Sequence, residues 1–299
     1  MARDYGRPLQ FGIFPSPDAD SVEEIFTMAG IADREGLDLI GIQDHPYQAA
    51  YLDTWTLMAA VLTRTERVRV FPDVANLPLR PPAMMAKAAA TLDLLSGGRF
   101  ELGIGAGAFD DAIAAMGGPR RTRAEAAAAL EEAIDVLRLF WSGERSVRYE
   151  GQHFRLAGAH PGPQPPHRIG IWLGVGGPRL LAALGRGADG WVPSNSYFPP
   201  EVLPSMQDRI DEAAAGAGRD PGEIQRIYNV FGLITDGSSD GFLHGPVEQW
   251  VDELTELATG DAGMDTFVFG AAEDHVRQTE VFTREVVPAV RDAVGRIRS

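Results

Sequence analysis

Two kinds of apolar segment alternate along the 299-residue chain. Short apolar runs that end at Gly, Pro or Asp are typical of buried strands, and longer segments with apolar residues every three or four positions are typical of amphipathic helices. The predicted strands cover residues 9–14, 37–44, 68–74, 100–107, 169–175, 190–194, 226–234 and 266–270. A helical pattern follows each strand, so the chain favours a (β/α)8 TIM barrel over a doubly wound sheet.

One segment interrupts this alternation. The stretch "VRYEGQHFRLAGAHPGPQPP" has turn residues at Glu150 and Gly151 and then several prolines, which predicts a short hairpin followed by an irregular connection. We interpret residues 143–168 as an insertion after the fourth strand and helix. Residues 1–299 are expected to form a single barrel domain.

Composition narrows the possible functions. A net charge of −15 and a pI near 4.8 argue against non-specific binding to nucleic acid or anionic membranes. The chain has no cysteine, which excludes disulfides and thiolate chemistry. No apolar stretch has the length of a signal peptide core or a membrane span, so a cytoplasmic protein is expected.

The second predicted strand ends in "QDHPY", at the edge where TIM barrels place their active sites. An imidazole pKa near neutrality suits His45 to proton transfer, with Asp44 beside it. The alternative is that Asp44 caps the loop and His45 is an ordinary polar neighbour. A metal site would need further histidines or carboxylates at later strand ends, and the pattern lacks a convincing set, so no metal is predicted.

Two more strand ends carry unusual residues. Pro72 in "FPDVANLPL" is compatible with a bulge or a distorted strand, but a plain irregular loop is the preferred interpretation. In "GIGAGAF", Gly103, Gly105 and Gly107 would let a flat or phosphorylated ligand approach the backbone, or would fit a tight barrel interior. Their spacing is not that of a dinucleotide fingerprint.

The fifth strand is followed by "GVGGP", in which Gly176 and Gly177 lead into a helix that starts at Pro178. Free N–H groups at a helix N-terminus bind phosphate, so we predict a phosphate site here, with a flexible loop as the alternative. A substrate pocket with apolar walls is also predicted, although each of its residues could equally be packing. Its predicted members are Phe14, Tyr47, Trp172 and Asn195.

Several segments together resemble the bacterial-luciferase-like superfamily of flavin-dependent oxidoreductases. They are "GLDLIGIQDHPY", "RPPAMMAKAAATLDLLSGGRFELGIGAG", the stretch from "LEEAIDVLRLFWSG" to "YEGQHFRL", and "WLGVGGPRLLAALGRGADGWV". The resemblance covers nearly the whole chain in order. It implies a (β/α)8 barrel that binds coenzyme F420 or reduced FMN at the strand ends, and it suggests a homodimer.

The resemblance also implies roles for individual residues. His45 matches a histidine that faces the coenzyme ring, and Asp44 matches its acidic neighbour. A non-proline cis peptide is expected between Asp73 and Val74, behind the ring. The full set implied to bind the coenzyme is Asp44, Asp73, Val74, Ala75, Asn76, Gly105, Ala106, Gly107, Gly176, Gly177 and Pro178.

Two positions depart from relatives of known type. Ala106 stands where luciferases place an arginine for the FMN phosphate, and Ala108 stands where deazaflavin-dependent sugar-phosphate dehydrogenases place a catalytic glutamate. We therefore expect neither of those activities. The predicted function is hydride transfer between coenzyme F420 and a small organic substrate. The alternatives are an FMN-dependent monooxygenase that uses molecular oxygen, and a barrel that binds a ligand without chemistry.

Overall fold

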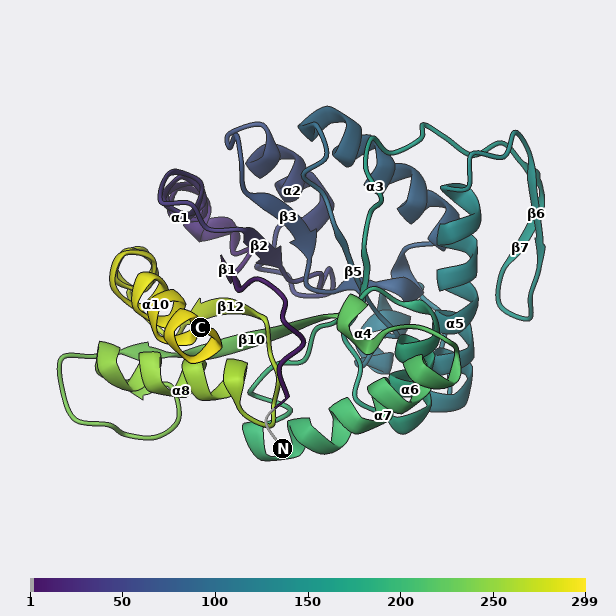
Figure 1. Ribbon diagram of the computed structural model, residues 1–299. Helices are drawn as coiled ribbons and strands as arrows, with labels where there is room; N and C mark the ends of the chain where they lie inside the picture. The colour runs from purple at the N-terminus through teal and green to yellow at the C-terminus, as the bar shows by residue number, and fades with distance from the viewer. Residues whose placement is uncertain (1–2) are drawn as a thin grey trace.

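The computed structural model describes residues 3–299 and forms a barrel of parallel strands surrounded by helices (Figure 1). Neighbouring strands follow the order β3-β2-β1-β12-β10-β9-β8-β5-β4. β4 continues β3 along the chain, and a parallel bridge joins Val70 of β3 to Phe100 before β5, which closes the ring. The barrel strands are β1 (Gln10–Ile13), β2 (Leu39–Ile42), β3 (Arg69–Pro72), β4 (Ala75–Asn76), β5 (Leu102–Gly105), β8 (Ile171–Leu173), β9 (Gly190–Trp191), β10 (Gln225–Ile234) and β12 (Thr266–Ala271).

The eight-fold repeat predicted from the sequence is confirmed when β3 and β4 are counted as one interrupted strand. β11 (His244–Gly245) pairs only with the end of β10. The helices are α1 (Val22–Arg34), α2 (Thr54–Leu62), α3 (Pro82–Ser96), α4 (Asp110–Ala115), α5 (Arg123–Phe140), α6 (Pro178–Gly187), α7 (Leu203–Gly216), α8 (Val247–Thr259), α9 (His275–Val281) and α10 (Val287–Arg298). Short 3-10 turns are η1 (Ala19–Ser21), η2 (Leu77–Leu79), η3 (Pro200–Val202) and η4 (Pro221–Glu223), and a π-helical segment, η5 (Phe282–Val286), joins α9 to α10.

Local signals explain where the helices begin and end. Pro82 is the first residue of α3, where its missing N–H costs nothing, and Gly97 stops that helix with a φ of +71°. Thr122 and Glu125 form a reciprocal capping box at the start of α5. These caps lie within a few residues of the positions that the sequence pattern indicates.

The third barrel strand is interrupted at Pro72, where the sequence favoured a plain irregular loop over a distorted strand. β3 ends at Pro72, the peptide bond between Asp73 and Val74 is cis, and β4 begins at Ala75. The cis bond therefore lies where the family resemblance placed it.

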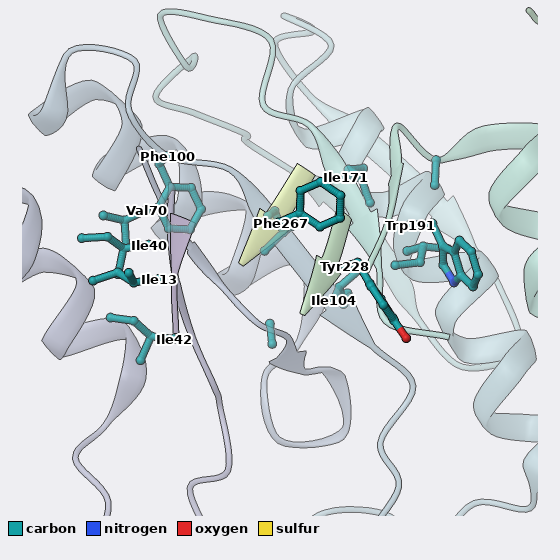
Figure 2. Packing of buried hydrophobic residues seen from close by; sticks show 14 of the residues in the cluster. Ile13, Ile40, Ile42, Val70, Phe100, Ile104, Ile171, Trp191, Tyr228 and Phe267 are labelled. Carbon is teal, nitrogen blue, oxygen red and sulfur yellow. The ribbon is translucent and has the colours of Figure 1, made fainter. Parts of the chain in front are cut away.

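The barrel has two apolar layers. Inside the ring, Phe71 and Trp172 pack with residues of the neighbouring strands. Outside it, strand residues such as Ile40 and Phe267 pack against the helices (Figure 2). Leu39 and Ile40 belong to different layers because successive side chains of a strand point to opposite faces.

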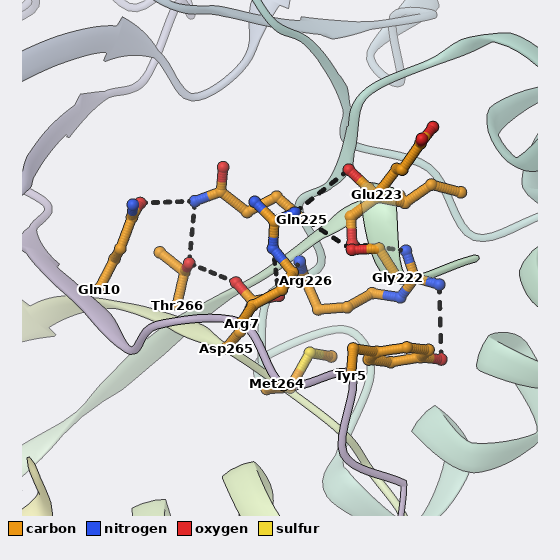
Figure 3. A network of polar contacts seen from close by, with 12 residues as sticks. Tyr5, Arg7, Gln10, Gly222, Glu223, Gln225, Arg226, Met264, Asp265 and Thr266 are labelled. Atoms are coloured by element: carbon orange, nitrogen blue, oxygen red, sulfur yellow. Dashed lines mark hydrogen bonds and ion pairs between the residues drawn. The ribbon is translucent and has the colours of Figure 1, made fainter. Parts of the chain in front are cut away.

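A polar network closes the barrel at the N-terminal ends of β10 and β12 (Figure 3). Arg226 is fully buried there, and its guanidinium binds Asp211 at 2.7 Å and lies 4.7 Å from the centre of the Tyr5 ring. Asp265 accepts the backbone N–H of Arg226 at 2.9 Å and forms an ion pair with Arg7 at 3.3 Å. This end of a TIM barrel is the one associated with stability rather than catalysis.

The predicted hairpin forms between α5 and β8. Its antiparallel strands are β6 (Val147–Glu150) and β7 (Arg155–Ala159), which project from the side of the barrel (Figure 1). Glu132 of α5 holds the turn, because its carboxylate accepts the backbone N–H groups of residues 152, 153 and 154 at 2.7–3.0 Å. Among residues 3–299, no helix is both long and apolar enough to cross a membrane.

Candidate active site

A cleft opens at the C-terminal ends of β2, β4, β5 and β8. It is lined by Asp44, His45, Tyr47, Val74, Ala75, Asn76, Gly105, Ala106, Gly107, Ala108, Phe109, Gly174, Val175 and Leu180. This edge carries the active sites of TIM-barrel enzymes. A separate hollow beside α9 is lined mainly by polar and charged side chains, and there Arg277 forms ion pairs with Asp236 and Asp274. The cleft, which combines apolar walls with a few polar groups, is therefore the candidate active site.

Val74 forms part of the cleft lining and packs against three glycines. A Cβ atom at Gly103, Gly105 or Gly174 would lie 3.1, 2.8 or 2.9 Å from a Val74 methyl group. Close packing therefore explains the glycines of β5. Gly107 has a φ of +89°, a conformation that favours glycine, and it turns the chain along the cleft.

Asp44 is held in an ion pair. Its side chain, 1% exposed, accepts hydrogen bonds from Arg80 at 2.9 and 3.1 Å and from the backbone N–H of Asn76 at 3.0 Å. Arg80 also binds Asp53, the N-cap of α2, at 2.5 Å. Asp44, which directly precedes His45, thus ties the end of β2 to β4 and to the segment after it. Arg80 was not predicted as a site residue from the sequence. An arginine in "LPLRPP", near an acid at a strand end, could have indicated an ion pair at the site.

His45 lies in an aromatic wall. Its ring stacks on Tyr47 with centroids 5.4 Å apart and meets Phe109 edge-on at 5.5 Å, and Tyr47 and Phe109 are 5.8 Å apart. Burial lowers the pKa of His45, and the Asp44 charge opposes this effect. Burial raises the pKa of Tyr47 to about 12. The wall is therefore largely uncharged near pH 7. Phe109, which directly follows the glycine-rich turn, was not predicted.

Asp73, predicted to bind the coenzyme, is not among the residues that line the cleft. Its carboxyl group is buried, and Oδ1 accepts a hydrogen bond from Asn229 at 3.0 Å. Asp73 Oδ2 and Asn229 Oδ1 are buried without a partner among the described residues. Burial raises the pKa of Asp73 to about 7. A protonated Asp73 would supply the donor that this pair lacks.

We expect Asp73→Asn to stabilise the protein above pH 7. Burial raises the folded-state pKa of Asp73 from 3.8 to about 7, so its proton is held more tightly in the folded than in the unfolded state. The free energy of unfolding should therefore fall as pH rises from about 4 to 7. Asparagine has the shape of the neutral acid and also supplies a hydrogen-bond donor. The free energy of unfolding of Asp73→Asn should therefore exceed that of wild type by about 1–3 kcal/mol at pH 8. Urea unfolding at pH 5 and pH 8 measures this, and a variant less stable than wild type at pH 8 would contradict it.

Three residues predicted for the substrate pocket are not among those that line the cleft. Trp172 is only 2% exposed and packs against Phe71 inside the barrel, with centroids 4.9 Å apart, so it is a core residue. Phe14 packs edge-on against Phe231 at 5.0 Å. Asn195 exchanges two hydrogen bonds, of 2.9 and 3.0 Å, with the backbone of Phe231. Tyr47 is the one member of the predicted set that lines the cleft.

The predicted phosphate site lies beside the cleft. Gly177 is the N-cap of α6 and Pro178 is its first residue, and no side chain in the described structure caps this end. A Cβ atom at Gly176 would collide with the Phe198 ring at 2.1 Å, so this position has no room for a side chain. Leu180 of α6 lines the cleft, which brings the N-terminal end of the helix next to it.

Comparisons with known proteins agree with this architecture. The family model for luciferase-like monooxygenases matches residues 7–240. An F420-dependent glucose-6-phosphate dehydrogenase from Nocardia farcinica is 30% identical over 231 residues, covering 74% of this chain and 68% of the relative. One from Kineococcus radiotolerans is 28% identical and covers 97% of this chain and 100% of the relative.

A solved structure has a similar fold. It is an F420-dependent secondary alcohol dehydrogenase in complex with an F420-acetone adduct, with a TM-score of 0.84 and 21% identity, and the match covers 96% of this chain and 100% of that chain. The family model alone spans well over half of the sequence. The chain therefore belongs to the luciferase-like monooxygenase family.

Proposed function

We propose that this protein is an oxidoreductase that transfers hydride between coenzyme F420 and a small organic substrate. The observation that carries the proposal is His45, which directly follows the buried Asp44 and lies in a cleft that adjoins the uncapped N-terminus of α6. Two relatives that together match the chain almost from end to end are named as F420-dependent dehydrogenases, which supports the coenzyme.

The residues around the cleft fit such a coenzyme. Gly105, Gly107 and Gly174 line the cleft, so part of its wall is backbone that a flat ring would approach closely. Asn76 Oδ1 is buried without a partner among the described residues, and it would accept a hydrogen bond from a ring N–H. The free N–H groups at the start of α6, after Gly177, would bind a phosphate group.

The coenzyme supplies a ring carbon that accepts or donates hydride, and the protein supplies positioning and proton transfer. A largely neutral His45 can accept the proton of a substrate hydroxyl and return it in the reverse direction. Asp44, already bound to Arg80, acts on the imidazole through its charge rather than exchanging protons itself. The aromatic neighbours of His45 shield it from water.

The competing function is an FMN-dependent monooxygenase, which the name of the family model favours. We expect purified apo-protein to bind coenzyme F420 in a fluorescence-quenching titration and to bind reduced FMN much more weakly. Turnover should consume no oxygen, because a deazaflavin carries carbon in place of the ring nitrogen and reacts poorly with it. Preferential binding of FMN together with oxygen consumption would establish the monooxygenase instead, and binding of neither would support a barrel that has lost chemistry.

We further propose that residues 1–299 act as one domain, in a homodimer, in the cytoplasm. Met84 and Leu95 are exposed apolar side chains on α3, which supports a contact between subunits on that helix. The net charge of −15 does not favour nucleic acid as a partner. Light scattering of the purified protein would measure its mass against the 32.2 kDa of one chain.

A further inference from the structure

The aromatic wall formed by His45, Tyr47 and Phe109 has a consequence for substrate choice. We infer that the cleft selects an uncharged, apolar alcohol or carbonyl compound, such as an aryl alcohol, and rejects phosphorylated or carboxylated compounds. This inference rests on the proposed function, because it concerns the substrate of the same site.

The charge of the lining supports the inference. The described residues that line the cleft include no lysine or arginine, and their only ionisable side chains are Asp44, His45 and Tyr47. Arg80, which contacts Asp44, already binds two carboxylates. The uncapped N-terminus of α6 beside the cleft is assigned to a phosphate group of the coenzyme. An anionic substrate would therefore lose its hydration at the aromatic wall and find no free cation to replace it, which is costly.

The shape of the lining also favours an apolar substrate. Phe109 is 46% exposed, so part of its ring remains free to contact a ligand, whereas Ala106 and Ala108 offer only methyl groups. Aromatic side chains contribute large apolar contact areas and favour stacked or edge-on partners. Among these wall residues, the His45 imidazole and the Tyr47 hydroxyl can hydrogen-bond a substrate oxygen.

For an alcohol substrate, the coenzyme and His45 account for every electron and proton that the reaction moves. On oxidation, the carbinol C–H bond breaks and its hydride reduces the coenzyme by two electrons. The O–H bond breaks, its proton passes to the His45 imidazole, and the carbon–oxygen double bond forms. Reduction of a ketone or aldehyde reverses each step. No further oxidant or cation is needed.

A matched pair of compounds tests this inference. We expect 1-phenylethanol to bind at least about tenfold more tightly than 4-(1-hydroxyethyl)benzoate, which adds one carboxylate to the same skeleton. Isothermal titration calorimetry measures both affinities, with and without coenzyme F420. Phe109→Arg should reverse the preference by placing a cation in the wall. Met116→Arg is the control, because Met116 is 51% exposed just after α4 and does not line the cleft.

The outcomes separate the two proposals. Equal or tighter binding of the benzoate by the wild type, or binding of neither compound, would overturn the substrate class. A preference unchanged by Phe109→Arg would overturn the role of the wall. Discrimination in favour of 1-phenylethanol by a protein that does not bind coenzyme F420 would support the substrate class and overturn the proposed coenzyme.

Discussion

His45→Ala should lower kcat by about 10²–10⁴-fold, the usual contribution of a positioned acid or base. The imidazole is the group in the cleft that can move a proton near neutral pH, since Tyr47 holds its proton up to about pH 12 and Asp44 is bound to Arg80. Coenzyme affinity should change little, because the proposed coenzyme contacts come from Val74, Asn76 and the start of α6. Absorbance of the coenzyme follows turnover, and fluorescence quenching follows binding.

The pH profile adds a readout specific to proton transfer. Because burial lowers the pKa of His45 below 6.5, kcat/KM for alcohol oxidation should fall only below that pH in the wild type. The variant should lose this acid limb. His160→Ala is the control, since it removes an exposed imidazole beside the hairpin, outside the cleft lining. Unchanged turnover of His45→Ala with the coenzyme bound would remove His45 from the mechanism.

Arg80→Met should destabilise the fold by about 3–5 kcal/mol, the range for removing one partner of a buried ion pair. Asp44 would remain as a buried carboxylate with a single hydrogen bond, from the backbone of Asn76. Asp53, the cap of α2, would lose its contact with the guanidinium as well. The midpoint of urea unfolding, with the slope of the transition checked against wild type, measures the loss.

Two further variants test whether the unpaired charge of Asp44 causes the loss of stability in Arg80→Met. Arg120→Met breaks an exposed ion pair with Asp111 and should change the free energy of unfolding by less than about 1 kcal/mol. Asp44→Asn in the Arg80→Met background removes the unpaired charge, so it should recover part of the lost stability. An Arg80→Met protein as stable as Arg120→Met would show that the buried pair contributes little.

Much of the fold could be predicted because its signals are local. Apolar runs mark the strands, and residues such as Pro82, Gly97 and Thr122 mark helix ends within one turn of the chain. Right-handed connection of eight such units then leaves few topologies besides a barrel. The edge that carries the site follows from the same rule, which is why Asp44 and His45 were found.

The family resemblance gave predictions that local sequence patterns could not give. It located the cis peptide between Asp73 and Val74, and it limited the coenzyme to F420 or reduced FMN, of which the named relatives support F420. It did not place every side chain. Asp73, expected near the coenzyme, points toward Asn229 inside the barrel.

Which side chains meet in the cleft was decided only by the tertiary structure. Every residue of β8 is buried, so no alternation of polar and apolar residues shows that Trp172 faces the barrel interior. Arg80 lies 36 residues from Asp44, and Phe109 lies 64 residues from His45, so only closure of the ring brings each pair together. The sequence by itself determined the barrel and the edge that carries the chemistry, because helix and strand patterns are local. The ion pair and the aromatic wall depend on long-range packing, which no local pattern encodes.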